Sequence, residues 1–148
     1  VRVYSENHKS INMHSKTRVM AFAESADNAL VRLHGLRDLL PPVKHVNCGG
    51  FFTSHRCREI ATAVLDPRLG GCIHVQETCP MEEVVCGANR TRAEFETIVE
   101  ELDRERGFLT DVKGIRRKPV VQHIQRTGSH TPGTFHCVVD IHIPPLPI

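Results

Sequence analysis

Apolar residues recur at helical spacing in three segments of the chain. The first follows Ser25 and ends before Pro41 and Pro42, the second follows Thr53 or Ser54 and ends near Asp66, and the third follows a Thr91-to-Glu94 capping box and ends at Gly107. Their apolar positions are, in order, Ala29, Leu30, Leu33, Leu36 and Leu40; Cys57, Ile60, Ala61 and Val64; and Phe95, Ile98, Val99 and Leu102. The pattern therefore predicts three amphipathic helices, two of them at about residues 55–66 and 91–106.

Short runs of apolar and β-branched residues separate these helices and predict strands. The runs are VKHVNCGGFFT at 43–53, CIHVQ at 72–76, EEVVCGA at 82–88, PVVQHIQ at 119–125 and TFHCVVDIHI at 134–143. A glycine pair at 49–50 interrupts the first run and indicates a bulge or a close backbone approach. A second pair at 70–71 lets the chain turn tightly into the strand that Cys72 begins.

The order of these elements predicts an α+β fold. From Val43 the chain reads strand, helix, strand, strand, helix, strand, with one extra strand. This is the ferredoxin-like split βαβ order, so we expect an antiparallel sheet with two helices on one face. The domain division that we expect is an N-terminal arm and helix at residues 1–42 and a ferredoxin-like domain at residues 43–148.

Composition narrows the class of protein only slightly. The chain has 148 residues, of which 40% are hydrophobic and 24% charged. Its formal net charge of +2 gives no overall positive field of the kind that indicates a polyanion-binding protein. No apolar run approaches the roughly 20 residues of a membrane helix. Six irregularly spaced cysteines favour buried thiols in a reducing intracellular compartment. Residues 1–23 are compatible with the N-terminus that is left after a mitochondrial or other organellar presequence has been removed, and equally with a partial chain.

Several segments together resemble the CutA family of divalent-cation tolerance proteins. They are EIATAVLDPRLGGCIHV at 59–75, EEV at 82–84, RTRAEFETIVEEL at 90–102 and PLPI at 145–148. The central aromatic hairpin of that family is missing, since the chain has no Trp and its only Tyr is Tyr4. The resemblance implies a ferredoxin-like homotrimer, or membership of a larger complex, with at most weak binding of a divalent metal such as copper or zinc.

Ten histidines and six cysteines make a metal site the first chemical hypothesis to consider. Cys72 and His74 alternate with apolar Ile73 and Val75, so they share one face of a strand and are the candidate ligand pair. An inert, buried Cys72 is the simpler explanation. With no paired CxxC motif, phosphate loop or glycine-rich dinucleotide motif in the sequence, we expect no tightly bound cofactor and no catalytic residues.

A basic loop, KGIRRK, is the one local feature that suits phosphate. Its candidate contact residues are Lys113, Arg116, Arg117 and Lys118. No interleaved aromatic residues offer base stacking, so nucleic acid is a partner only through this loop, and a solvated loop explains the charges as well.

These observations favour a non-enzyme that works by association, a CutA-like oligomeric binding or scaffold protein. Two alternatives stay open at this point. One is an accessory subunit of a large organellar complex or ribosome, and the other is a ligand-sensing regulatory domain of the βαββαβ type.

Overall fold

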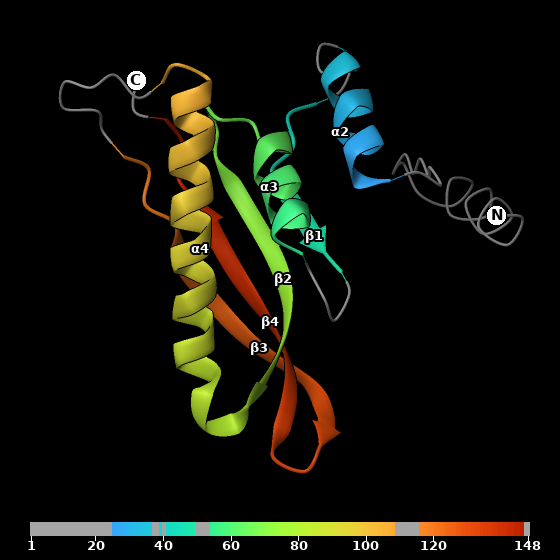
Figure 1. Cartoon of the computed structure of the whole chain (residues 1–148), viewed down its shortest axis with the longest axis vertical. Coiled ribbons are helices and arrows are strands. Elements are labelled where there is room, and N and C mark those ends of the chain that lie inside the picture. Colours follow the sequence, from blue (N-terminus) through green and yellow to red (C-terminus); the bar gives the residue numbers. More distant parts are fainter. Residues whose placement is uncertain (1–24, 37–38, 40, 50–53, 109–115, 147–148) are drawn as a thin grey trace, which may run out of the picture.

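The computed structural model describes residues 25–36, 39, 41–49, 54–108 and 116–146 (Figure 1). Its helices are α2 (Ala26–Gly35), α3 (His55–Val64) and α4 (Val84–Glu105), with a 3-10 turn, η1 (Met81–Glu83), before α4. Its strands are β1 (His45–Cys48), β2 (Gly71–Pro80), β3 (Val120–Thr131) and β4 (Thr134–Ile143). Within this part of the chain, no helix has the length and apolar character needed to cross a membrane.

The four strands form one mixed sheet in the order β1-β2-β4-β3. β1 pairs with β2 in parallel, with Val46 opposite Ile73, while β4 pairs with both β2 and β3 in antiparallel fashion. The fold is thus α+β, as expected, but the ferredoxin-like antiparallel sheet is not confirmed. The split βαβ plan places a strand between the two parallel strands, whereas here they are direct neighbours.

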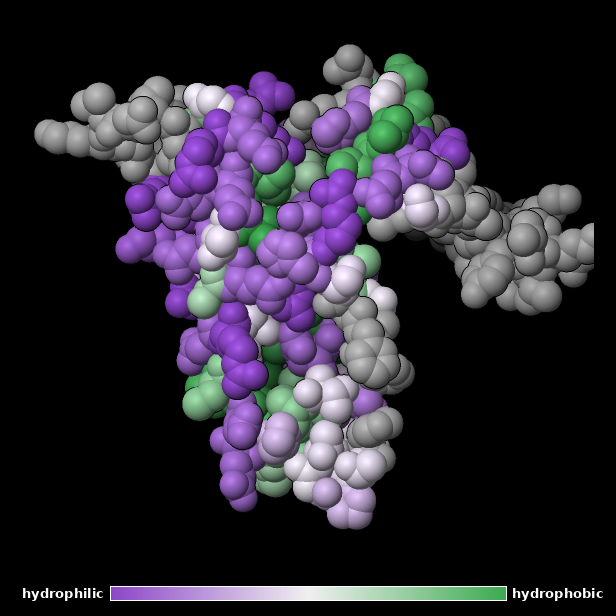
Figure 2. Space-filling view, in the orientation of Figure 1, coloured by the Kyte–Doolittle hydropathy of each residue, from purple (hydrophilic) through white to green (hydrophobic). Residues whose placement is uncertain are grey.

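Both major helices cover the same face of the sheet, as the two apolar stripes predicted (Figure 1). Ala61 and Leu65 from the α3 segment and Phe95, Ile98 and Val99 from α4 pack on alternate residues of the central strands. Those strand residues are Ile73, Val75, Cys137, Val139, Ile141 and Ile143. Figure 2 shows hydrophilic residues over the outer surface of α4 and hydrophobic residues in the seam between α4 and α3.

Serine caps fix the starts of two helices where the sequence predicted them. The Ser25 hydroxyl accepts from the backbone N–H of Asn28, and the Ser54 hydroxyl accepts from that of Cys57, both at 3.3 Å. α2 packs beside α3, where Arg56 pairs with Asp27 at 2.7 Å. The proposed arm of residues 1–42 therefore contacts the rest of the chain through α2, and the domain boundary at residue 42 stays a prediction.

The segment 82–88 departs from its predicted strand. It forms η1 and the first turn of α4, so that helix begins at Val84, well before Thr91. Thr91 lies inside the helix, where its hydroxyl donates to Glu77 Oε1 at 2.8 Å instead of capping a helix end. The strand that precedes it is longer than predicted, because β2 continues to Pro80.

Arg117 and Asp103 form a buried ion pair that ties the segment before β3 to α4. Arg117 Nε donates to Asp103 Oδ2 at 2.8 Å and Nη2 donates to Oδ1 at 2.5 Å, while Nη1 donates to the Pro144 carbonyl. The two side chains are only 3% and 2% exposed. Because this bidentate pair is buried, removal of either partner leaves the charge of the other buried and uncompensated.

We predict that Arg117→Met lowers the free energy of unfolding by about 3–5 kcal/mol, because it leaves Asp103 buried without its counter-ion. Urea unfolding followed by circular dichroism measures the change. The control is Arg116→Met at the neighbouring position, whose exposed pair with Glu100 at 3.3 Å should cost no more than about 1 kcal/mol. Equal costs for the two variants would contradict the prediction.

Candidate functional site

The parallel pair β1 and β2 creates an edge where a ligand site is expected. In open α/β sheets, ligands bind outside the carboxyl ends of parallel strands. β1 ends at Cys48, which pairs with Val75, and β2 continues beyond that point to Pro80. The N-termini of α3 and α4 follow these strand ends in the chain. We call this region the carboxyl edge.

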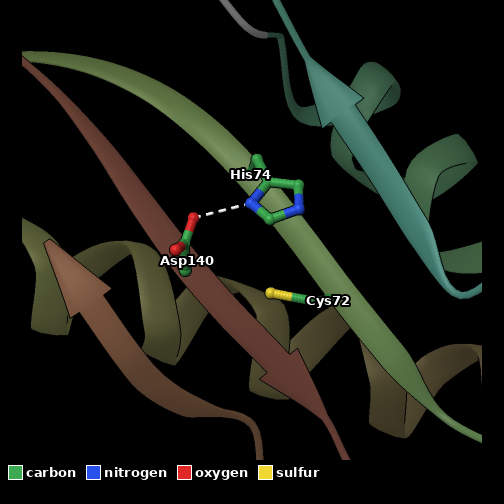
Figure 3. Close-up of side chains that lie close together, drawn as sticks. All are labelled: Cys72, His74 and Asp140. Carbon is green, nitrogen blue, oxygen red and sulfur yellow. Dashed lines mark hydrogen bonds and ion pairs between the residues drawn. The ribbon is translucent and has the colours of Figure 1, made fainter. Parts of the chain in front are cut away.

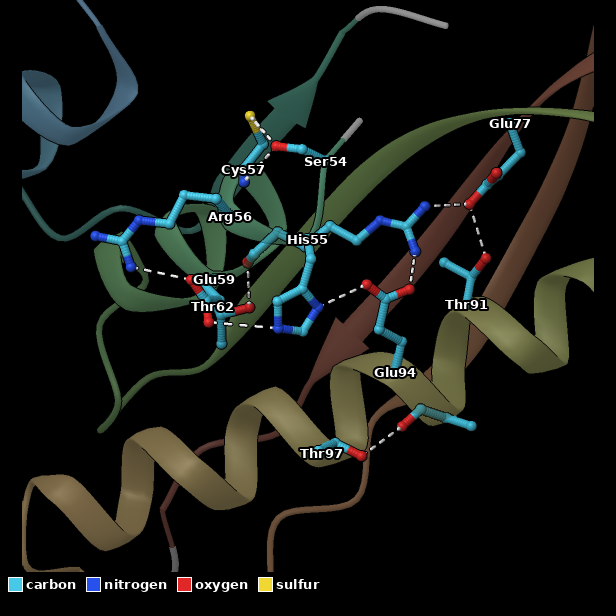
Figure 4. Close-up of polar contacts among 12 residues, drawn as sticks. Ser54, His55, Arg56, Cys57, Glu59, Thr62, Glu77, Thr91, Glu94 and Thr97 are labelled. Carbon is cyan, nitrogen blue, oxygen red and sulfur yellow. Dashed lines mark hydrogen bonds and ion pairs between the residues drawn. The ribbon is translucent and has the colours of Figure 1, made fainter. Parts of the chain in front are cut away.

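Glu77 of β2 and Glu94 of α4, both labelled in Figure 4, share one guanidinium of α3 at the carboxyl edge. Arg58 of α3 donates from Nη2 to Glu77 of β2 at 2.7 Å and from Nη1 to Glu94 of α4. Thr91 donates to the same Glu77 oxygen, and His55 contacts the other oxygen of Glu94 at 3.0 Å. This hydrogen bond with Glu94 raises the pKa of His55. The Arg58 side chain is only 11% exposed, and its buried Nε has no hydrogen-bond partner in the described part of the chain.

A cavity of about 190 Å³ opens beside this network. Its walls come from the end of β2, the first turns of α4 and the facing part of β4, and include Arg58, Glu77, Gly87, Arg90 and Cys137. Polar groups of both charges therefore face a space bounded by the apolar Ala88 and Val139. A concave site with a few convergent polar groups is the usual form of a binding site, although this cavity is smaller than most.

Buried thiols line the same region without being activated. Burial, with Cys57 as a further cause, raises the pKa of Cys48 to about 11. Burial, together with a hydrogen bond to Cys79, raises the pKa of Cys137 to about 12, and the two sulfurs lie 3.7 Å apart. Both thiols therefore stay protonated at neutral pH and are poor nucleophiles.

The predicted metal pair lies elsewhere, on the face of the sheet opposite α3 and α4 (Figure 3). Cys72 and His74 share this face of β2, as the sequence predicted, and Asp140 joins them from β4. His74 Nδ1 lies 2.7 Å from Asp140 Oδ1, and one ligand atom from each of the three residues falls within 4.8 Å of the others. Sequence reasoning missed Asp140, although its strand alternates in the same way as β2.

The structure separates the predicted phosphate contacts. Lys113 lies outside the described residues. Arg117 is buried against Asp103, so its guanidinium does not face solvent. Arg116 and Lys118 are exposed, and Arg116 pairs with Glu100. Of the basic loop, these two remain as candidate contacts for a polyanion.

Among known proteins, only solved structures resemble this chain. No family model matches the chain, and no curated protein matches it in sequence. The structure of Trm5b from Pyrococcus abyssi superimposes with a TM-score of 0.58 and 13% identity, covering 96% of this chain and 34% of Trm5b. TYW2 from M. jannaschii, solved in complex with AdoMet, gives a TM-score of 0.51 and 17% identity, covering 70% of this chain and 39% of TYW2. The chain thus spans little more than a third of either neighbour.

These neighbours correct the resemblance to the CutA family, which is wrong. TYW2 was solved in complex with AdoMet, so this fold also occurs in a protein that binds a cofactor, and the arguments for a non-catalytic scaffold without a cofactor fail with the resemblance. The alternatives of an organellar accessory subunit and of a ligand-sensing regulatory domain gain no support. The physical reason is that a helix, a glycine pair and a strand encode any βαβ crossover, not the CutA arrangement alone.

The Arg58 network was also missed from the sequence. Its acids come from two other elements, and the charged residues of α3 looked like an ordinary solvated helix face. One signal was present in the sequence. Arg58 precedes Ala61, a residue of the predicted apolar face, by three positions, so its side chain could be expected to lie near the buried side of the helix, where the structure places Ala61.

Two arginines on the same helix provide a matched test. We predict that Arg58→Met lowers the free energy of unfolding by about 1.5–3 kcal/mol, since charged hydrogen bonds to Glu77 and Glu94 are lost at a partly buried site. Arg56→Met also removes contacts with two acids, Asp27 and Glu59, but its side chain is 57% exposed. That variant should change stability much less than Arg58→Met does, because solvent screens exposed ion pairs. Chemical denaturation of both variants checks the difference, and a cost at Arg56 that equals the cost at Arg58 would refute it.

Proposed function

We propose that this chain forms part of the catalytic domain of an AdoMet-dependent tRNA methyltransferase. The observation that carries the proposal is the superposition on Trm5b over 96% of the chain. At 13% identity this likeness establishes the fold alone, so activity, substrate and cofactor are inferred. In this proposal the carboxyl edge faces the reaction, and its cavity lies on the substrate side.

The chemistry of the carboxyl edge supports a ligand-facing role. A buried N–H without an acceptor is costly, and native proteins supply an acceptor from water or a ligand. Arg58 Nε is such a donor, and Arg58 lines the cavity. Glu77 and Thr91 lie beside it and add a carboxylate and a hydroxyl. Arg90, with a side chain 77% exposed, stands at the rim, where an RNA phosphate would meet it.

The described residues do not by themselves fit a whole AdoMet molecule. The cavity at the carboxyl edge is about 190 Å³, below the about 300–1,000 Å³ of typical small-molecule sites. The sequence also contains no glycine-rich fingerprint to hold a nucleotide at a helix start. The remainder of a cofactor site would therefore come from residues outside the described ones.

Partners and compartment stay proposals of a weaker kind. All six cysteines are free, which supports a reducing compartment, while the organelle is open. A tRNA partner requires local basic contacts, because the net charge is only +2, and the exposed Arg90, Arg116 and Lys118 supply candidates. A homotrimer or a larger protein complex stays a prediction.

Gly87 offers a way to block the cavity without weakening the fold. It lies in α4 and lines the cavity, and a Cβ added there would meet Cys79 Cβ at an ordinary 3.9 Å. Leucine at this position fills the space and, inside a helix, is favoured over glycine by up to about 1 kcal/mol. Gly87→Ala is the matched control, because it gains helix propensity but leaves the space open.

The test is transfer of tritium from methyl-labelled AdoMet to unmodified tRNA by the protein that carries this chain. We predict incorporation by the wild type and by Gly87→Ala, and a loss of about tenfold or more in kcat/KM for Gly87→Leu, equivalent to about 1.4 kcal/mol. Circular dichroism should show all three folded. Absence of both methyl transfer and AdoMet binding in the wild type would refute the function, and full activity of Gly87→Leu would refute the placement of the site.

A further inference from the structure

The sheet face opposite α3 and α4 gathers histidines around one carboxylate and one thiol. Cross-strand register aligns two rows on this face, the first through Asn47, His74, Asp140 and His123, and the second through His45, Cys72, His142 and Val120. Side chains directly opposite on neighbouring strands lie about 4.5–5.5 Å apart at Cβ. Imidazole, thiol and carboxylate groups therefore lie close together where β2 pairs with β4.

We propose that Cys72, His74 and Asp140 bind a single zinc ion through Sγ, Nδ1 and one carboxylate oxygen. The three residues come from two adjacent strands of a well-paired sheet, which holds their backbones in place (Figure 3). Their ligand atoms already lie within 4.8 Å of one another. A tetrahedral ion with bonds of about 2.0–2.3 Å requires ligand separations of about 3.3–3.8 Å. The ion would therefore replace the hydrogen bond between His74 Nδ1 and Asp140 Oδ1, and these two atoms, now 2.7 Å apart, would move apart to bind it.

The donor set matches zinc better than the common hard cations. One sulfur, one nitrogen and one oxygen suit a borderline-soft ion, whereas magnesium and calcium select oxygen ligands. Three protein ligands leave a fourth tetrahedral position for water or another small ligand. His142 is the register partner of Cys72 and lies on the same face of the sheet.

His45 supplies the outer contact that such a site needs. Its Nδ1 lies 3.2 Å from His74 Nε2, with ring centroids 5.5 Å apart and ring planes within 6°. That centroid separation is about the largest that a 3.2 Å contact allows, so the two nitrogens point at each other in nearly one plane. His74 Nε2–H can therefore donate to His45 while Nδ1 binds the metal. A second hydrogen bond of this kind normally orients a histidine ligand.

The experiment titrates zinc, and separately cobalt, into the chain after treatment with a chelator. We expect one ion per chain and a cobalt spectrum with a thiolate-to-metal charge-transfer band. Cys72→Ser, His74→Gln and Asp140→Asn should each lower affinity by more than about 100-fold, and Cys72→Ser should abolish the band. His45→Ala should cost about 10–100-fold, as outer partners of ligands do. Circular dichroism checks that each variant is folded.

The control variant is His136→Asn. His136 lies in β4, as Asp140 does, and its Nδ1 contacts the Thr78 hydroxyl at 3.0 Å. It should bind zinc as the wild type does. Binding that survives all three ligand substitutions, or that falls equally in the control, would show adventitious binding to surface histidines and overturn the proposal. A cobalt complex without a thiolate band would overturn it as well. None of these outcomes depends on methyl transfer.

Discussion

The close approach of three chain segments at Gly70 and Gly71 is the constraint on which the sheet depends. Gly70 has φ +66°, and a Cβ on it would lie 2.4 Å from the Ile143 carbonyl oxygen at the end of β4. A Cβ on Gly71 would lie 2.5 Å from the Lys44 carbonyl oxygen just before β1. Only glycine lets the chain turn after α3 and enter the sheet between β1 and β4. The Lys44 carbonyl then accepts from Cys72 N–H at 2.8 Å, which starts the parallel pairing.

This central position of β2 decides what each part of the sheet can do. Because β1 lies directly beside it in parallel, the carboxyl ends of both strands meet the helix starts at one edge, where Arg58 and the cavity lie. Because β4 pairs with all of β2 on the other side, Asp140 lies opposite His74. β2 therefore contributes Glu77 to the carboxyl edge on one face of the sheet, and His74 to the group formed with Cys72 and Asp140 on the other face.

Local signals in the sequence predicted most elements but not how they pair. Ser25 and Ser54 marked helix starts, and apolar residues predicted the strand at 134–143 and the first half of β3, whereas the polar second half of β3, to Thr131, was missed. The start of α4 was missed because Val84 and Val85 are β-branched residues that favour strands. The order of the strands rests on contacts between residues far apart in the chain. Asp103 could have been found, since it follows Val99 by four positions on the buried face of α4.

The polar face of the sheet constrains whatever covers it. Doubly wound sheets carry helices on both faces, but α3 and α4 cover only one in the described part of this chain. On the other face, Cys72 is buried and His74 and Asp140 are only 32% and 23% exposed, because they shield one another. An apolar helix packed there would strip water from Asn47 and His142, and each polar group left unpaired would cost about 1–3 kcal/mol. This face must therefore be covered by a polar layer, by a bound ion with its waters, or by solvent. Each of these gives Cys72, His74 and Asp140 hydrogen-bonding or ligating partners.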